Sequence, residues 1–399
     1  MQGVVSEKYS QRSLTRAGYI FNQSIRLVRA GREYFELLDQ LIRQAKSTIH
    51  IQTYIFDEDE TGRRVARALI EASQRKVKIA LVVDGYASQN LSDSFIATLR
   101  EAGVHFRFFA PLLKSQEFYF GRRLHHKVIV VDGRYSLVGG INIGNHYNDT
   151  AENVAWLDWA LYTEGHVGVV LQQICEARLQ RGLVKMVRQT LKPKPRFVVP
   201  VEGQFPVRPR INDWVRRKRD ITGSYLEMLR NAQSHVCIIS SYFLPGKVLR
   251  KHLSRATKRG VKVTVILAGI SDVKMAKHAE RFMYGWLLRN NITIYEYQRK
   301  VLHAKLATYD SRWVTIGSYN VNNISAYASV ELNMDVYHEE FARDVDARLQ
   351  RIITNECIQI TEEVYRKKGT LWNRFIQRSS YDIFRIVLFL FTFYFKQRD

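Results

Sequence analysis

The sequence repeats one pattern of strands and helices in its two halves, and this repeat constrains the fold more than any other feature. In each half an apolar, β-branched run expected to be a strand is followed by a stretch with helical spacing and then by a second strand. The two sets span residues 47–56, 62–76 and 77–85 in the first half and 234–243, 246–260 and 261–269 in the second. Strand–helix alternation predicts α/β layers. A single repeat of about 180 residues indicates a duplicated domain, not a solenoid.

Each copy continues with a second helix, expected at residues 92–102 and 274–290, and a short strand, expected at 104–109 and 292–297. Five of the seven prolines fall between residues 193 and 209, and such a stretch is expected to be extended and unable to join a central strand. We therefore predict a first domain over 1–190, a linker over 191–212, a second domain over 213–365 and a C-terminal segment over 366–399.

Both copies carry the same polar motif on their third expected sheet strand: His, then Lys two residues later, Asp at seven, Gly at fourteen and Asn at seventeen. The matching sets are His125, Lys127, Asp132, Gly139 and Asn142, and His303, Lys305, Asp310, Gly317 and Asn320. Because positions i and i+2 of a strand share a face, each His and its Lys are expected to project into one cavity. His126 has the opposite parity and should point away.

The other motif residues have different expected places. Asp132 is followed by Gly133 in a turn beyond the strand, so we expect it to brace the motif without touching substrate. A hairpin should return each Asn beside its His. Glu331 follows His303 by 28 residues, and Asp158 is its counterpart in the first half, five positions further out. A carboxylate fixes the tautomer of an imidazole, and we expect Glu331 to hold His303 and Asp158 to hold His125.

One such motif would be weak evidence for catalysis, whereas two matched copies inside a whole-domain repeat are not a coincidence. The motifs resemble those of the phospholipase D superfamily over nearly the whole chain. The chain looks most like bacterial cardiolipin synthases of the short type without N-terminal membrane spans, as in IHIQTYIFDEDETG, GGIN, SSYFLP and ELN. Gly140 replaces the superfamily's usual Ser, which is present as Ser318, and a Gly-Gly pair there is common in cardiolipin synthases.

The resemblance implies two α/β domains, each a mixed sheet flanked by helices, packed about a pseudo-twofold axis with the active site between them. It implies phosphatidyl transfer without metal or other cofactor, through a phosphohistidine. His125 would be the nucleophile, as in two-motif relatives, and His303 the general acid and base. The chemistry of the residues agrees, because two lysines can supply fixed cations for a transferring phosphoryl group and two asparagines can donate hydrogen bonds to it.

Charge and termini bear on the partners. Sixty-one Lys and Arg against 38 Asp and Glu give a net charge of +23, which attracts an anionic membrane or nucleic acid. Residues 381–395 are apolar and aromatic with basic flanks, too short for a spanning helix and suited to the membrane interface. We therefore expect phospholipid substrates such as phosphatidylglycerol, an anionic membrane surface and no nucleic acid.

The N-terminus lacks the apolar core of a secretory signal, which predicts a peripheral protein on the cytoplasmic side of the membrane. Cys175, Cys237 and Cys357 are far apart and have no metal-binding spacing, so they are expected to be reduced thiols. Several alternatives stay open. Water could replace the acceptor alcohol, the chain could be a nuclease or an inactive scaffold, and residues 381–395 could be a core or dimer helix. The donor lipid, the acceptor and the oligomeric state are not determined.

Overall fold

The structure is a computed structural model that describes residues 10–110, 123–179, 204–322, 329–367 and 370–396. The strands of the first half are β1 (Ile20–Arg29), β2 (Thr48–Thr53), β3 (Lys78–Asp84), β4 (His105–Phe109), β5 (Arg123–Leu124), β6 (Lys127–Val131), β7 (Tyr135–Gly139) and β8 (Trp159–Gly165). Those of the second half are β9 (Phe205–Asp213), β10 (Lys218–Arg219), β11 (His235–Ser240), β12 (Lys262–Ile270), β13 (Ile292–Val301), β14 (Lys305–Tyr309), β15 (Trp313–Gly317), β16 (Ser329–Tyr337) and β17 (Cys357–Gln359).

The strands form one continuous mixed sheet that runs through both halves. Its order is β4–β3–β2–β6–β7–β8–β1–β9–β16–β15–β14–β11–β12–β13–β17. The order on one side of the β1–β9 pair mirrors that on the other, with β2, β3 and β6 corresponding to β11, β12 and β14. The duplicated α/β fold predicted from the repeat is therefore confirmed, and the two copies meet along antiparallel β1 and β9.

Helices cover the sheet of each half. They are α1 (Gln11–Arg16), α2 (Arg32–Gln44), α3 (Glu60–Gln74), α4 (Asp93–Glu101) and α5 (Val167–Leu179), and then α7 (Asp220–Asn231), α8 (Lys247–Lys258), α9 (Lys274–Phe282), α10 (Tyr284–Arg289), α12 (Glu339–Glu356), α13 (Glu362–Lys367) and α14 (Leu371–Lys396). Side-chain caps start several of them; for example, Asp59 accepts from Gly62 N at α3, and Ser92 accepts from Phe95 N at α4. The single helix predicted over 274–290 is instead two, divided at Met283.

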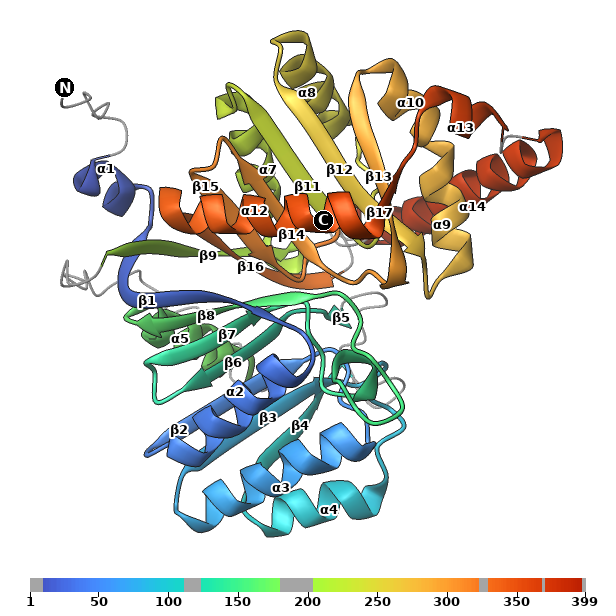
Figure 1. Cartoon of the computed structure of the whole chain (residues 1–399). Coiled ribbons are helices and arrows are strands. Elements are labelled where there is room, and N and C mark those ends of the chain that lie inside the picture. Colours follow the sequence, from blue (N-terminus) through green and yellow to red (C-terminus); the bar gives the residue numbers. More distant parts are fainter. Residues whose placement is uncertain (1–9, 111–122, 180–203, 323–328, 368–369, 397–399) are drawn as a thin grey trace.

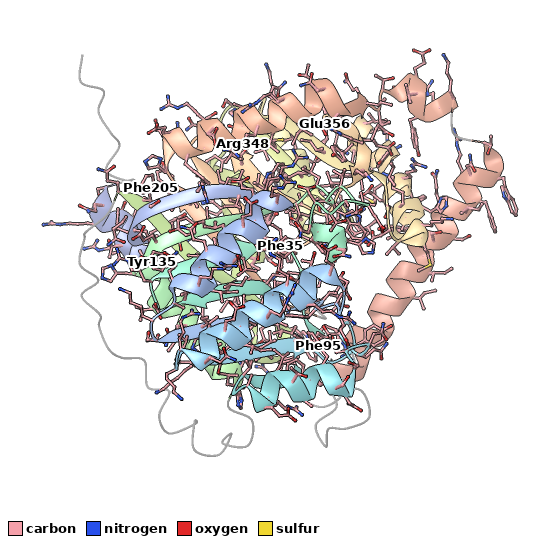
Figure 2. The ribbon with its side chains drawn as sticks, turned by 60° about the horizontal axis from the view of Figure 1, so that its bottom comes forward. Phe35, Phe95, Tyr135, Phe205, Arg348 and Glu356 are labelled. Atoms are coloured by element: carbon pink, nitrogen blue, oxygen red, sulfur yellow. The ribbon has the colours of Figure 1, made fainter. Side chains whose placement is uncertain are left out.

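The core has three main parts. Helices α2, α3 and α4 pack on the strands of the first half, and α7, α8 and α10 on those of the second (Figure 1). The third part lies between α5, α12 and strands of both halves, and includes Trp159, Leu161, Leu306, Leu332 and Met334. Figure 2 shows the same layers with side chains, with Phe35 on α2, Phe95 on α4, and Arg348 and Glu356 along α12. Because this third cluster draws on both halves, the interface between them is itself hydrophobic core.

The prediction that residues 191–212 form a linker outside the sheet is wrong for its C-terminal part. Strand β9 carries Pro206 and Pro209, yet it pairs with β1 and with β16. The pairing with β1 covers only residues 205–207 and that with β16 only residues 207–212, so each proline has a partner strand on one side only. On its open side a proline's missing N–H costs no hydrogen bond. The preceding residues 191–203 lie outside the described part of the chain.

Candidate active site

The two motifs meet where the halves touch. Each His lies just before its strand, and not on it as the motif spacing suggested, because β6 begins at Lys127 and β14 at Lys305. The His125 N–H donates to the carbonyl of Val330 in the other half (3.0 Å). Likewise, the His303 N–H donates to the carbonyl of Leu157 (2.8 Å). The backbone of each motif is thus anchored on the opposite copy.

The carboxylate partners are crossed between the halves, and the expected pairing within each half is wrong. The Nδ1 of His125 bonds Oε2 of Glu331 (2.9 Å), and the Nδ1 of His303 bonds Oδ2 of Asp158 (2.6 Å). The reason is the sheet topology, since β5 pairs with β16 beside Glu331 and Leu157 bridges to Leu302. Neither half alone contains a motif histidine together with its carboxylate partner.

Asp158 and Glu331 are nevertheless structural counterparts, as predicted. Gly139 pairs with Ala160 across β7 and β8, and Gly317 pairs with Asn333 across β15 and β16. Each carboxylate stands two residues before that partner. The interval from the histidine to the carboxylate is five residues longer in the first half. The extra residues therefore lie in the connection before β8, and the carboxylates keep the same position relative to the paired strands.

The two lysines are buried beside the imidazoles. Lys127 Nζ donates to the carbonyl of its own His125 (2.6 Å) and lies 5.2 Å from the centre of the Tyr54 ring. Lys305 Nζ donates to the carbonyl of His303 and to Ser241 Oγ, the latter at 2.9 Å. Burial lowers the pKa of Lys127 to about 7 and that of Lys305 to about 8. An anion bound between them would restore both charges.

Burial also sets the ionisation of the imidazoles. It lowers the pKa of His125, against the opposing effect of Glu331, and it holds the pKa of His303 well below the usual value. Burial raises the pKa of Asp158 to about 7. Near neutral pH both imidazoles are therefore uncharged. With Nδ1–H donating to a carboxylate, Nε2 carries the lone pair that can attack phosphorus or take a proton.

Asp132 and Asp310 brace the motifs as predicted. Asp132 lies in a left-handed turn and accepts from the N–H groups of Lys46, Ser47 and Thr48 at 2.7–2.9 Å. Asp310, in the same conformation, accepts from the N–H groups of Gln233, Ser234 and His235 at 2.8–3.0 Å. Each carboxylate thus ties the turn after its motif strand to the start of β2 in the first half or β11 in the second, away from the imidazoles.

The asparagines hold loops. Asn142 Oδ1 accepts from Ile55 N (3.0 Å), and its amide donates to the Tyr147 hydroxyl (2.7 Å). Asn320 Oδ1 accepts from Ser241 Oγ (3.0 Å). Each brings its motif to the segment that follows β2 or β11, and no bond joins either Asn to its own His among the described residues. Donation to a substrate phosphate stays a prediction.

His126 points away from the site, as its parity predicted. Its Nε2 bonds Gln52 Oε1 (2.7 Å), and Gln52 in turn donates to the carbonyl of Cys175 on α5 (2.8 Å). All three cysteines are free thiols, and burial raises the pKa of Cys175 to about 12. Across the described ranges, no group of three or more His, Cys, Asp and Glu side chains is placed to hold a metal ion.

Sequence reasoning missed several residues around the site. Tyr54 and Ser241 occupy one position of the repeat, and comparing residues 47–56 with 234–243 would have shown both. Asp84 ends β3, is fully buried and accepts from Leu124 N (2.8 Å), which fixes the residue before His125. Its counterpart in the repeat is Ala268, so the duplication gave no signal for it. Tyr147 packs edge-on against His303 with ring centres 5.2 Å apart.

A mixed sheet duplicated about one axis, with a His, Lys and carboxylate set from each copy, defines a phospholipase-D-like protein. The family model described as "Cardiolipin synthase, PLD-like domain" matches residues 38–161 and 225–353. The chain belongs to this family of enzymes. It is 34% identical to cardiolipin synthase B of Salmonella typhi over 90% of this chain and 87% of the relative, and 31% identical to that of Escherichia coli K12 over 88% and 84%.

Solved structures show the same fold. The phosphatidylserine synthase of Haemophilus influenzae Rd KW20 superposes with a TM-score of 0.73, covering 94% of this chain and 97% of that one at 14% identity. The polyphosphate kinase of Porphyromonas gingivalis superposes with a TM-score of 0.57 over 86% of this chain and 49% of its own, at 16% identity. At these identities the likeness concerns the fold only.

Proposed function

We propose that the chain transfers a phosphatidyl group between two phospholipids, for example converting two phosphatidylglycerol molecules into cardiolipin and glycerol. The observation that carries this proposal is the pair of crossed His–carboxylate contacts with a buried lysine beside each imidazole. Two neutral imidazoles at one interface can divide the work of nucleophile and proton carrier. The names of the relatives, which match over most of their length, support phospholipids as the substrates.

In the first step Nε2 of His125 attacks the phosphorus of the donor, and the bond from phosphorus to the headgroup oxygen breaks. His303 enters this step protonated at Nε2, because the anionic phosphate of the bound donor raises its pKa, and it gives that proton to the departing alcohol. In the second step His303 removes the proton of an acceptor hydroxyl, whose oxygen attacks phosphorus and displaces His125. Lys127 and Lys305 neutralise the charge that builds on the phosphoryl oxygens.

The assignment of His125 as nucleophile rests on the resemblance to two-motif relatives. One structural feature supports it, because the His125 side chain is 17% exposed and that of His303 is 9%. Asp158 would then hold the imidazole that carries protons, and Glu331 the nucleophile. A short contact of 2.6 Å to a carboxylate stabilises the imidazolium that His303 must become.

Mass spectrometry of the products formed on phosphatidylglycerol vesicles tests the transfer. Cardiolipin and glycerol are the expected products. Phosphatidic acid and glycerol without cardiolipin would make the chain a hydrolase with water as acceptor. Cleavage of plasmid DNA with no lipid turnover would make it a nuclease. Turnover should also survive excess EDTA, because the two lysines supply the positive charge; loss on chelation with recovery by a divalent ion would contradict this.

We further propose that the protein works on the cytoplasmic face of the membrane, bound peripherally to anionic lipid. The net charge of +23 and the C-terminal aromatic run support this. Among the described residues, no helix is long and apolar enough to cross a bilayer. Deleting residues 371–399 should weaken binding to anionic vesicles and spare turnover of a small soluble phosphodiester. An insoluble truncated protein would instead assign α14 to the core.

A further inference from the structure

Helix α14 turns its apolar side outward. Trp372, Phe375, Ile383 and Ile386 are 68, 62, 47 and 58% exposed. Their spacing of three, eight and three residues places them in one stripe along the helix. The rings of Trp372 and Phe375 stack with centres 5.8 Å apart. A helix of a globular protein normally buries such a stripe, so this one suits an apolar medium outside the protein.

The opposite side of α14 faces the protein and carries Arg374, Gln377 and Tyr381. Tyr381 packs on Phe282 of α9 with ring centres 4.9 Å apart, which holds the helix against the second half. Figure 1 shows α14 beside α9 at the edge of that half. Between α14, α10 and α13 lies a cavity of about 520 Å³ whose polar lining is mostly basic. Its charged side chains are Arg289, Glu362, Arg366, Arg374 and Arg378.

Among the described residues, carboxylates pair with only two of the four arginines of this cavity. Glu362 forms an ion pair with Arg366 (2.6 Å), and Arg378 lies 3.8 Å from Asp382. Arg289 and Arg374 form no ion pair with any residue that the structure describes.

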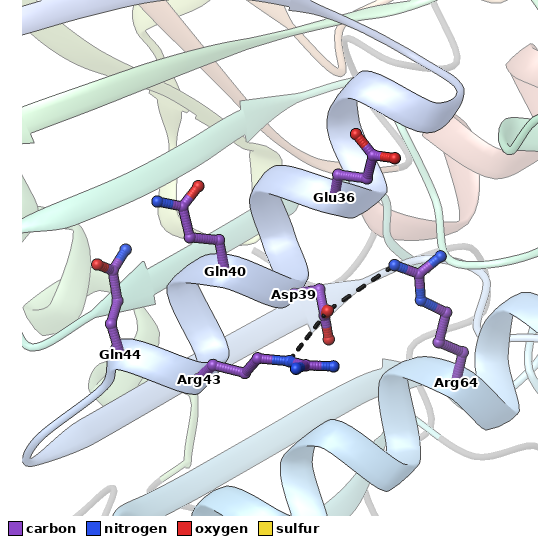
Figure 3. Close-up of a pocket in the computed structure, with 6 residues that line it drawn as sticks. All are labelled: Glu36, Asp39, Gln40, Arg43, Gln44 and Arg64. Carbon is purple, nitrogen blue, oxygen red and sulfur yellow. Dashed lines mark ion pairs between the residues drawn. The ribbon is translucent and has the colours of Figure 1, made fainter.

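A second surface hollow shows the contrast. There the arginines are matched, because Asp39 contacts Arg43 at 3.1 Å and Arg64 at 3.8 Å (Figure 3). The arginines of the cavity beneath α14 are therefore arranged to receive an anion from outside.

We propose that this cavity binds the phosphate of an anionic phospholipid headgroup, while the outward stripe of α14 lies among the acyl chains. An interfacial helix sits with its polar flank at the level of the phosphates, and Arg378, one turn after Phe375, lies on that flank. Guanidinium groups match a phosphate in a bidentate way. The site is separate from the catalytic residues and holds a lipid that is not consumed.

Vesicle binding of the full-length protein tests the site, with two variants and a matched control. Arg289→Gln/Arg374→Gln removes the two unpaired charges. Arg289→Lys/Arg374→Lys keeps the positive charge but removes the planar guanidinium group that can bind a phosphate through two hydrogen bonds. Arg255→Gln/Lys258→Gln removes two exposed charges of α8, away from α14. Affinity is measured by sedimentation with vesicles of phosphatidylglycerol and phosphatidylcholine in equal parts, and the fold is checked by turnover of bis(p-nitrophenyl) phosphate.

The Gln pair should bind these vesicles about 30-fold more weakly, at roughly fivefold per charge. The Lys pair should lose several-fold, and the α8 control should stay within about twofold, since neither of its side chains lines the cavity. All variants should keep the soluble turnover.

Equal losses in the Gln pair and the control, or a Lys pair that binds like wild type, would reduce the effect to general electrostatic attraction and overturn the site. Loss of soluble turnover in the Gln pair would make the arginines structural. Glycerol 1-phosphate that competes as strongly as the vesicles would assign the cavity to a free phosphate and overturn the lipid as its source.

Discussion

The two halves build the same catalytic arrangement with different neighbours around it. In both, the ammonium group of the lysine donates to the carbonyl of its own histidine. In the first half it also lies against the ring of Tyr54, and in the second it bonds the hydroxyl of Ser241, at the same position of the repeat. A ring face and a hydroxyl both stabilise a buried cation. The two halves therefore share the position of the lysine's positive charge. They differ in the side chain that stabilises it.

The carboxylates show a second difference, which concerns volume. Glu331 accepts from the hydroxyl of Ser318 (2.5 Å), whereas the first half has Gly140 at that position. A Cβ on Gly140 would lie 2.4 Å from Asp158 Oδ2. The shorter carboxylate thus occupies the space in which a serine would carry its Cβ. Gly with Asp and Ser with Glu are two solutions to placing one carboxylate against an imidazole of the other half.

The largest expected effect separates the roles of the two histidines. His125→Ala should remove turnover and form no covalent adduct, because no nucleophile remains. His303→Ala should lose about 10²–10⁴-fold in turnover, as for removal of a general acid and base. With a donor whose leaving group needs no proton, the His303→Ala protein should still form the phosphatidyl adduct and keep it, recoverable on His125 by peptide mass spectrometry. An adduct on His303 in the His125→Ala protein would reverse the assignment.

The lysines should come next in size and test whether the halves contribute equally. Lys127→Met and Lys305→Met should each lower turnover by about 10²–10³-fold, because each removes a cation aimed at the transferring phosphoryl group. Methionine keeps the buried volume, and loss of a costly buried charge should leave the melting temperature unchanged or higher. A melting temperature that falls with activity would mean that the lysines act through the fold.

The sequence predicted the fold class and the residues of the site. It did not predict that each histidine bonds the carboxylate of the other half. Strand spacing identified both motifs, and the repeat aligned Asp158 with Glu331. The crossed pairing of histidines and carboxylates could not be predicted, because it depends on which strand lies beside β16. That is a long-range contact, which local periodicity does not report. Strand β9 was not predicted because its prolines are typical of a loop. They are tolerated in this strand only because each has a partner strand on one side alone. Asp84 was not predicted as a site residue because the equivalent position in the second half is not an aspartate.

The lowered lysine pKa values predict a pH effect on substrate binding. In the empty site the charge of Lys127 is present below a pKa of about 7 and is lost as pH rises through it. Because kcat/KM reports the free enzyme, it should fall above about pH 7 by up to about tenfold per pH unit. A bound phosphodiester favours the charged form and raises this pKa, so kcat falls only at higher pH. Lys127→Arg stays charged, so the limb should begin only near pH 8, where Lys305 loses its charge, whatever the absolute rate. An unchanged limb in Lys127→Arg would assign the titration to another group.

The smallest effect tests the volume argument directly, by giving the second half the pair of the first. Glu331→Asp alone should reduce kcat/KM, because its shortened carboxylate must sit where Ser318 holds its Cβ. Ser318→Gly alone should cost about tenfold through the lost hydroxyl donor. The double variant Ser318→Gly/Glu331→Asp reproduces the arrangement of Gly140 and Asp158, so it should be more active than Glu331→Asp. That order is possible only if the two changes are coupled, by at least about 1.4 kcal/mol in a double-mutant cycle of kcat/KM. Strictly additive losses would show that Gly140 and Asp158 do not compensate for each other, and that the two carboxylates are held in place by different means.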